Sequence, residues 1–145
     1  MIPHKKPAEI LLVEDNPADI EIIAEALHRE NNNAHLTITR TGEEALDYLF
    51  RQGKFITAQR PDIILLDLTL PGISGKEVLS RVKTNPGLTD IPVLVLTGSD
   101  SDEDALEVSA MHANCYIAKR MGMESSINML QGVLHFWLSV ARLPG

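Results

Sequence analysis

Polar residues able to do chemistry stand directly after short apolar runs of this sequence, where such side chains are least expected by chance. They are Glu14 and Asp15 after residues 10–13, Asp67 after 63–66, Thr97 after 93–96, and Lys119 after 114–118. Carboxylates are preferred ligands of Mg²⁺, and a carboxylate can attack phosphorus as a nucleophile. Hydroxyl and ammonium groups stabilise the charge on a transferred phosphoryl group. The set predicts phosphoryl transfer to an aspartate with Mg²⁺ as the cofactor.

Asp67 is the predicted nucleophile, because it ends an unbroken run of four apolar residues. Asp15 and Asp67 can each ligate the metal directly, and Glu14 can hold a metal-bound water. The backbone carbonyl of Thr69 is placed to supply another oxygen ligand. Taken singly, each of these residues has an ordinary interpretation as a helix cap, a turn residue or a surface charge. Their joint occurrence at successive strand ends makes coincidence the weaker interpretation.

Alternating apolar runs and amphipathic stretches predict the elements that position this set. Three runs are unbroken, as in parallel strands covered on both faces, whereas the run over 36–39 alternates and is predicted near a sheet edge. Cap signals at Asn16, Thr41, Ser74 and Ser101 open four helices, and a fifth helix carries an apolar stripe near the C-terminus. The prediction is a flavodoxin-like (βα)₅ fold, a doubly wound five-stranded parallel sheet. In such sheets ligands bind beyond the carboxyl ends of the strands.

Composition favours a soluble protein of one domain over residues 1–145. The 13 basic and 20 acidic residues give a net charge of −7, which argues against nucleic acid as a partner. No apolar run is long enough to cross a membrane, and no signal peptide is visible. The single cysteine, Cys115, cannot form an internal disulfide, which fits a reducing compartment. We therefore expect a cytoplasmic protein with an N-terminal extension over 1–8, a C-terminal tail over 139–145 and no output domain.

The sequence resembles the receiver domains of two-component response regulators. The resemblance rests on the segments 10–16, 61–68, 70–75, 92–98 and 116–119. It implies that Asp67 is the phosphoacceptor for a histidine kinase, that Glu14 and Asp15 serve Mg²⁺, and that Lys119 contacts the phosphoryl group. It also implies that Thr97 and Tyr116 form a switch pair. A protein of this family is not an enzyme in the ordinary sense, since it catalyses only its own phosphorylation and dephosphorylation.

Within that family, the chain is similar to the small regulators paired with phytochrome-type histidine kinases. The segments 16–20, 114–117 and 136–139, with 143–144, carry this narrower resemblance. One position departs from the family pattern: Arg120 stands where proline usually follows the lysine, often in a cis peptide. A cis bond costs ~3–4 kcal/mol before a non-proline residue and less than about 1 kcal/mol before proline. The loop after Lys119 is therefore predicted to be strained or rebuilt.

The last helix predicts a partner surface. Its inward stripe is expected to comprise Ile127, Leu130, Leu134, Trp137 and Leu138. That stripe leaves Met129, Val133, Phe136 and Val140 facing elsewhere, and a second apolar face indicates a partner. The alternative is that the C-terminal residues fold back over their own domain. The family resemblance favours a homodimer through the fourth helix, fifth strand and fifth helix, or through the tail. Output is expected to go through an unknown downstream protein.

Three other classes of protein remain as alternatives. A phosphohydrolase with an aspartyl nucleophile needs a second acid two residues later, where this chain has Thr69. A flavin carrier needs a hydroxyl- and glycine-rich loop after the first strand, where this chain has Glu14 and Asp15. A receiver-like interaction module that works without phosphorylation would not need all five site residues, but the Arg120 departure keeps this alternative open.

Overall fold

Five parallel strands form the central sheet of the protein. The computed structural model describes residues 7–30, 33–98, 102–119 and 122–140. The strands are β1 (Glu9–Val13), β2 (His35–Thr39), β3 (Ile63–Asp67), β4 (Val93–Thr97) and β5 (Cys115–Ala118). Their spatial order is β2-β1-β3-β4-β5, and every neighbouring pair is parallel. The predicted (βα)₅ fold is confirmed, and the alternating segment β2 lies at an edge as predicted.

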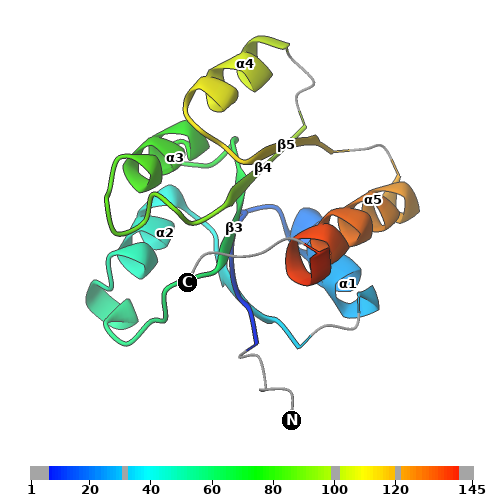
Figure 1. The fold of residues 1–145 in the computed structure, drawn as a ribbon, viewed down its shortest axis with the longest axis horizontal. Coiled ribbons are helices and arrows are strands. Elements are labelled where there is room, and N and C mark those ends of the chain that lie inside the picture. The colour runs from blue at the N-terminus through cyan, green and yellow to red at the C-terminus, as the bar shows by residue number, and fades with distance from the viewer. Residues whose placement is uncertain (1–6, 31–32, 99–101, 120–121, 141–145) are drawn as a thin grey trace.

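Helices cover both faces of this sheet (Figure 1). They are α1 (Pro17–Arg29), α2 (Gly42–Leu49), α3 (Gly75–Lys83), α4 (Asp102–Ala110) and α5 (Met123–His135). A short 3-10 turn, Gly53–Phe55, lies between α2 and β3, and a π-helical turn, Phe136–Val140, continues α5. Helices α1 and α5 pack on one face, and α2, α3 and α4 pack on the other. None of the helices in the described ranges is long and apolar enough to cross a membrane.

The strands divide their side chains between two cores, because successive residues of a strand point to opposite faces. Leu11 and Leu66 lie in the core under α2 and α3, whereas Leu12 and Leu65 lie in the core under α1 and α5. All four are buried. Burial on both faces explains why β1, β3 and β4 are unbroken apolar runs. The parallel register brings the residues that follow these strands to one edge of the sheet.

Three of the predicted helix caps are confirmed. The side-chain oxygens of Asn16, Thr41 and Ser74 accept hydrogen bonds from backbone N–H groups in the first turns of α1, α2 and α3. The Glu44 carboxylate, three residues after the Thr41 cap, accepts from the Arg40 N–H at 3.1 Å, one residue before the cap. The predicted cap Ser101 lies outside the described residues. The turns from β1 to α1 and from β3 to α3 are thus set by local hydrogen bonds.

A lysine at the end of α3 ties that helix to the starts of β4 and β5. The Lys83 ammonium donates to the carbonyl oxygens of Thr89 (3.1 Å) and Ile91 (2.8 Å) and to Oδ1 of Asn114 (3.0 Å). Burial lowers the pKa of Lys83. The Asn114 oxygen also accepts from the Val93 N–H at 2.9 Å. This network fixes the edge strand β5, which carries Tyr116 and leads into Lys119.

The prediction that Met129 and Val133 belong to a second apolar face of α5 is wrong. Ile127, Leu130 and Leu134 are buried as predicted, and Trp137 and Leu138 are partly buried against the same core. However, Met129 and Val133 are also half-buried in that core. The reason is that α5 packs on α1 as well as on the sheet, so its apolar face must be wider than one stripe. Phe136 remains 50% exposed, and the Val140 side chain lies outside the described part of the chain.

Candidate phosphoacceptor and metal site

Three carboxylates meet at the carboxyl ends of β1 and β3. Glu14 is fully buried, Asp67 is 4% exposed and Asp15 is exposed. One oxygen from each lies within 4.8 Å of the others. Negative charges held this close in a mostly buried place repel one another strongly, because the surroundings screen them less than water does. The cluster therefore needs positive charge, and its all-oxygen donor set suits a hard divalent cation.

The effect of burial and of charge repulsion in this cluster is largest on the pKa of Glu14. Burial raises the pKa of its carboxyl from 4.5 to about 7, and the hydrogen bond and negative charge of Asp67 act in the same direction. The ammonium of Lys119 and the Asn16 N–H, which donates to Glu14 Oε1 at 3.2 Å, oppose the rise. Near neutral pH, the metal-free site therefore holds a proton for part of the time. A cation entering the site has to compete with that proton.

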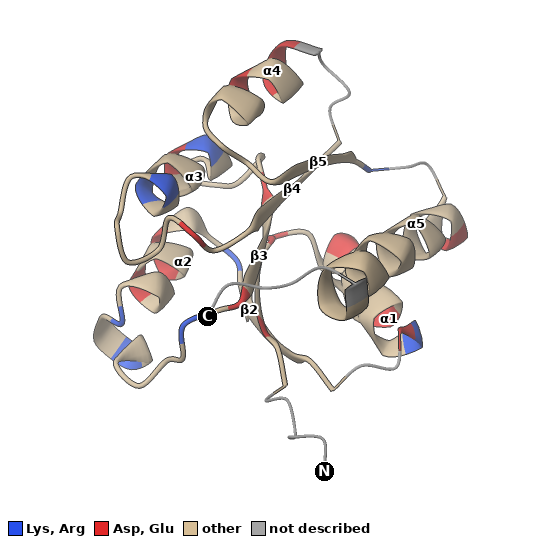
Figure 2. Ribbon diagram, viewed as in Figure 1, with Lys and Arg blue, Asp and Glu red and all other residues tan. Residues whose placement is uncertain are grey.

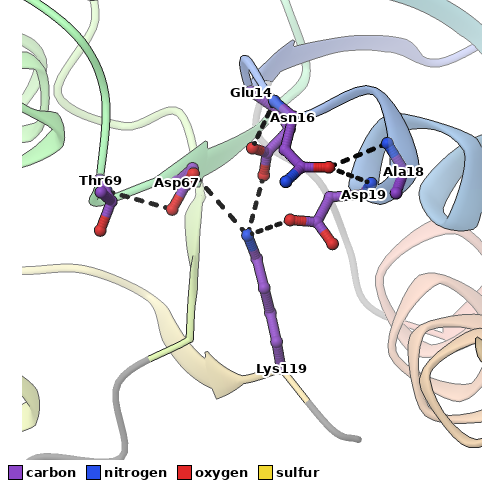
Figure 3. A network of polar contacts seen from close by, with 7 residues as sticks. All are labelled: Glu14, Asn16, Ala18, Asp19, Asp67, Thr69 and Lys119. Carbon is purple, nitrogen blue, oxygen red and sulfur yellow. Dashed lines mark hydrogen bonds and ion pairs between the residues drawn. The ribbon is translucent and has the colours of Figure 1, made fainter. Parts of the chain in front are cut away.

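Lys119 supplies positive charge to the cluster (Figure 3). Its Nζ lies 2.7 Å from Asp19 Oδ2, 3.1 Å from Glu14 Oε2 and 3.7 Å from Asp67 Oδ2. Burial by itself lowers the pKa of Lys119, but the hydrogen bond to Asp19 and the charges of Glu14 and Asp67 outweigh it, so the pKa is raised. The side chain is therefore an ammonium at neutral pH, and it points at the predicted nucleophile.

The backbone around Asp67 is packed tightly against the start of α3. The Thr69 N–H donates to Asp67 Oδ1 at 3.1 Å, which fixes one carboxylate oxygen. Gly75, the first residue of α3, leaves no room for a side chain, because a Cβ there would lie 2.3 Å from the Asp67 carbonyl oxygen and 2.6 Å from Leu68 Cα. The metal-ligand role predicted for the Thr69 carbonyl stays a prediction. Asp67 is thus held at the end of β3 by the Thr69 N–H and by the close packing of its backbone on the start of α3.

Thr97 and Tyr116 lie on the neighbouring strands β4 and β5. Thr97 is 2% exposed, and Tyr116 is half-buried against the core on the α2, α3 and α4 face of the sheet. Val95 is paired with Tyr116 and lies two residues before Thr97, so the side chains of Thr97 and Tyr116 point to the same face. This placement is compatible with the predicted switch pair, whose role stays a prediction. Arg120 lies outside the described residues.

The structure brings Glu14, Asp15, Asp67 and Lys119 together, and it adds a residue that the sequence reasoning missed. Asp19 lies in the first turn of α1 and makes the shortest of the three contacts with the Lys119 ammonium. Its position four residues after Asp15 was the available signal, because the first turn of a helix that follows a strand end faces that end.

Comparison with known proteins decides the family. The model of the response regulator receiver domain matches residues 10–131. The chain belongs to this family. It is therefore a signalling protein of two-component phosphorelay systems, built on a receiver domain, rather than an enzyme with an external substrate.

Two relatives match this receiver over nearly their whole length. Response regulator Rcp1 of Synechocystis sp. is 41% identical, over 95% of this chain and 94% of that protein. The probable methanogenesis regulatory protein FilR2 of Methanothrix harundinacea is 39% identical, over 96% of this chain and 89% of that protein. The receiver described here is thus similar to regulators of about its own length.

Solved structures agree with the sequence relatives. The phosphorylated cyanobacterial phytochrome response regulator RcpA matches with a TM-score of 0.93 and 42% identity, over 97% of this chain and 100% of that one. The Mn²⁺-bound form of response regulator Rcp1 matches with a TM-score of 0.92 and 41% identity, over 96% of this chain and 100% of that one. The receiver fold, and the similarity to phytochrome response regulators predicted from the sequence, are confirmed.

Proposed function

We propose that this receiver takes a phosphoryl group on Asp67 from a histidine kinase, in a Mg²⁺-dependent reaction, and signals through contacts with other proteins. The observation that carries the proposal is the buried Asp67 carboxylate at the end of β3. It lies within 4.8 Å of carboxylate oxygens of Glu14 and Asp15 and 3.7 Å from the Lys119 ammonium. The proposed nucleophile, the proposed cation ligands and the Lys119 ammonium thus lie together at one edge of the sheet.

The residues present fit a divalent metal. Glu14, Asp15 and Asp67, with the Thr69 carbonyl, would hold it, and their oxygen atoms match the preference of Mg²⁺. When bound, the metal neutralises charge on the cluster and on the phosphoryl oxygens. The structure of Rcp1, which is 41% identical to this chain, is a Mn²⁺-bound form, and it supports the proposal that this receiver also binds a divalent cation.

Asp67 and the side chains around it have different roles in the phosphoryl transfer. One Asp67 carboxylate oxygen attacks the phosphorus of a phosphohistidine, a new O–P bond forms, and the N–P bond breaks as imidazole leaves with the electron pair. The Lys119 ammonium stabilises the equatorial phosphoryl oxygens, and the Thr97 hydroxyl donates a hydrogen bond to one of them. Reorientation of Thr97 then lets Tyr116 turn inward, which changes the surface near α4.

The similarity to RcpA supports a phytochrome-type histidine kinase as the partner. We further propose that residues 1–145 form one receiver domain and that the protein is a cytoplasmic homodimer. The segment 139–145 is proposed as a dimer-forming tail. Large apolar side chains exposed on α4, α5 and the π-helical turn support a dimer through these elements: Leu106 (73%), Met123 (55%) and Phe136 (50%). Sedimentation at micromolar concentration tests it. A clean monomer with and without phosphodonor contradicts the dimer.

Mass spectrometry after incubation with acetyl phosphate and Mg²⁺ tests the central proposal. Wild type is expected to gain one phosphoryl adduct, and both Asp67→Asn and removal of Mg²⁺ with EDTA are expected to abolish it. Asp47→Asn, at an exposed position of α2, is the matched control and should be phosphorylated like wild type. An adduct that survives Asp67→Asn contradicts the assignment of the phosphoacceptor.

A further inference from the structure

Asp19 is the acceptor closest to the Lys119 ammonium. The Asp19 contact is 2.7 Å, whereas Glu14 lies at 3.1 Å and Asp67 at 3.7 Å. Asp19 lies outside the group of carboxylates that are close enough together to share a cation. The ammonium is thus drawn toward a carboxylate that lies beside the cluster of Glu14, Asp15 and Asp67, not within it (Figure 3).

The local structure leaves the Asp19 carboxylate available for this contact. An acid at the third position of a helix ordinarily serves the helix N-terminus by accepting a hydrogen bond there. In α1 that task falls to Asn16, whose Oδ1 accepts from the Ala18 N–H at 2.9 Å and from the Asp19 N–H at 3.2 Å. These bonds hold the Asp19 backbone in place while its side chain reaches Lys119.

The other end of the contact is fixed as well. The Lys119 N–H donates to the Thr97 carbonyl oxygen at 2.7 Å, which anchors the lysine backbone at the end of the sheet. Both side chains line a cavity of about 160 Å³, whose other lining residues carry no charge. On that side, the described residues offer the ammonium no carboxylate other than Asp19.

We propose that Asp19 is a positioning residue that holds the Lys119 ammonium beside the carboxylate cluster and thereby makes room for the divalent cation. A cation that binds Glu14 and Asp67 has to displace an ammonium from the same oxygens, because the two positive charges repel each other at this distance. Asp19 keeps the ammonium paired after that displacement. The proposal rests on the proposed function, since it assigns Glu14 and Asp67 to the metal.

Asp19→Asn removes the charge and keeps the shape. Without Asp19, the ammonium pairs only with Glu14 and Asp67 and competes directly with the cation. The dissociation constant for Mg²⁺, measured by titration calorimetry at pH 8, is expected to rise about fivefold, within the range of coupling between groups in contact. The concentration of Mg²⁺ that half-saturates phosphorylation by acetyl phosphate should rise by the same factor, while the rate at saturating Mg²⁺ changes less than twofold.

Three further variants separate positioning from a general loss of negative charge. Glu21→Gln removes an exposed charge from the same helix and should leave Mg²⁺ affinity within twofold of wild type. Asp19→Glu restores the charge and should recover most of the affinity. In a Lys119→Met background, Asp19→Asn should change Mg²⁺ affinity by less than twofold, because no ammonium remains to be held.

Two results overturn the proposal. One is an unchanged Mg²⁺ affinity in Asp19→Asn, and the other is an equal loss of affinity with and without Lys119. Failure of the proposed function looks different: wild type would acquire no phosphoryl group, or Asp67→Asn would still acquire one. The binding cycle is measured without phosphodonor, so it tests Asp19 whichever way the phosphorylation experiment turns out.

Discussion

Replacing Glu14 by glutamine should stabilise the metal-free protein, and the gain should grow with pH. The carboxyl is fully buried, and its pKa of about 7 in the folded chain exceeds its ordinary value of 4.5. The folded state therefore binds a proton that the unfolded state has lost between these two pH values. Glu14 then contributes most stability below pH 4.5, and this contribution is lost as the pH rises to 7. Glutamine has nearly the same shape as the protonated acid, and its side chain does not ionise in this pH range.

The size of the gain follows from the two pKa values. Each pKa unit corresponds to about 1.4 kcal/mol, so ionising Glu14 in the folded chain at pH 8 costs about 3 kcal/mol. At pH 5.5 the folded carboxyl is still protonated, and the difference from glutamine is about 1 kcal/mol. The free energy of unfolding of Glu14→Gln should therefore exceed that of wild type by these amounts. These values already include the attraction between Glu14 and Lys119, because the charge of Lys119 helps to set the pKa of Glu14.

Urea unfolding followed by circular dichroism, in EDTA at pH 5.5 and pH 8, measures both values. Glu21→Gln is the control and should shift stability by less than about 0.5 kcal/mol at either pH, as exposed substitutions usually do. Saturating Mg²⁺ should reverse the order, since a ligand that binds only the folded state stabilises it and the variant lacks a ligand group. A gain that is equal at the two pH values, or a loss at pH 8, would refute the reasoning.

Further variants probe the supports of the site. Gly75→Ala should cost about 1–3 kcal/mol, because its methyl group would overlap the Asp67 backbone, and should slow phosphorylation by acetyl phosphate; an unchanged rate would show that the start of α3 does not position Asp67. Lys83→Met removes three hydrogen bonds and should lower the free energy of unfolding by about 2 kcal/mol in urea titrations, with Arg81→Met as the exposed control. Arg120→Pro should raise the rate of phosphorylation or the lifetime of the phosphoryl group, and identical kinetics in wild type and variant would count against a strained loop.

Hydrophobic periodicity was sufficient to predict the layers of this fold. Strands buried on both faces have to be unbroken apolar runs, so the runs ending at Val13, Leu66 and Leu96 could be assigned to the middle of a parallel sheet. The same logic located the site, because a polar residue after such a run has to lie at the carboxyl edge. Glu14, Asp15 and Asp67 were found in this way.

Periodicity could not predict which helices pack on each other. The apolar residues of α5 exceed what one sheet face needs, and the excess on Met129 and Val133 was interpreted as a partner surface. Those side chains instead lie partly buried in the core under α1 and α5. Contacts between distant segments, such as Arg29 with Glu124 at 2.5 Å, join these two helices and leave no pattern in either segment alone.

The contact of Asp19 with Lys119 is another interaction between distant segments that the sequence pattern could not predict. From the sequence, an acid in the first turn after Asn16 and Pro17 is already accounted for by the helix dipole, so its position four residues after Asp15 is only a weak signal that it belongs to the site. Its contact with Lys119 joins residues 100 positions apart and exists only because α1 and β5 meet at one edge. The sequence has Arg120 where the family pattern places a proline after this lysine. A carboxylate 2.7 Å from the ammonium can aim the lysine through its charge rather than through the backbone.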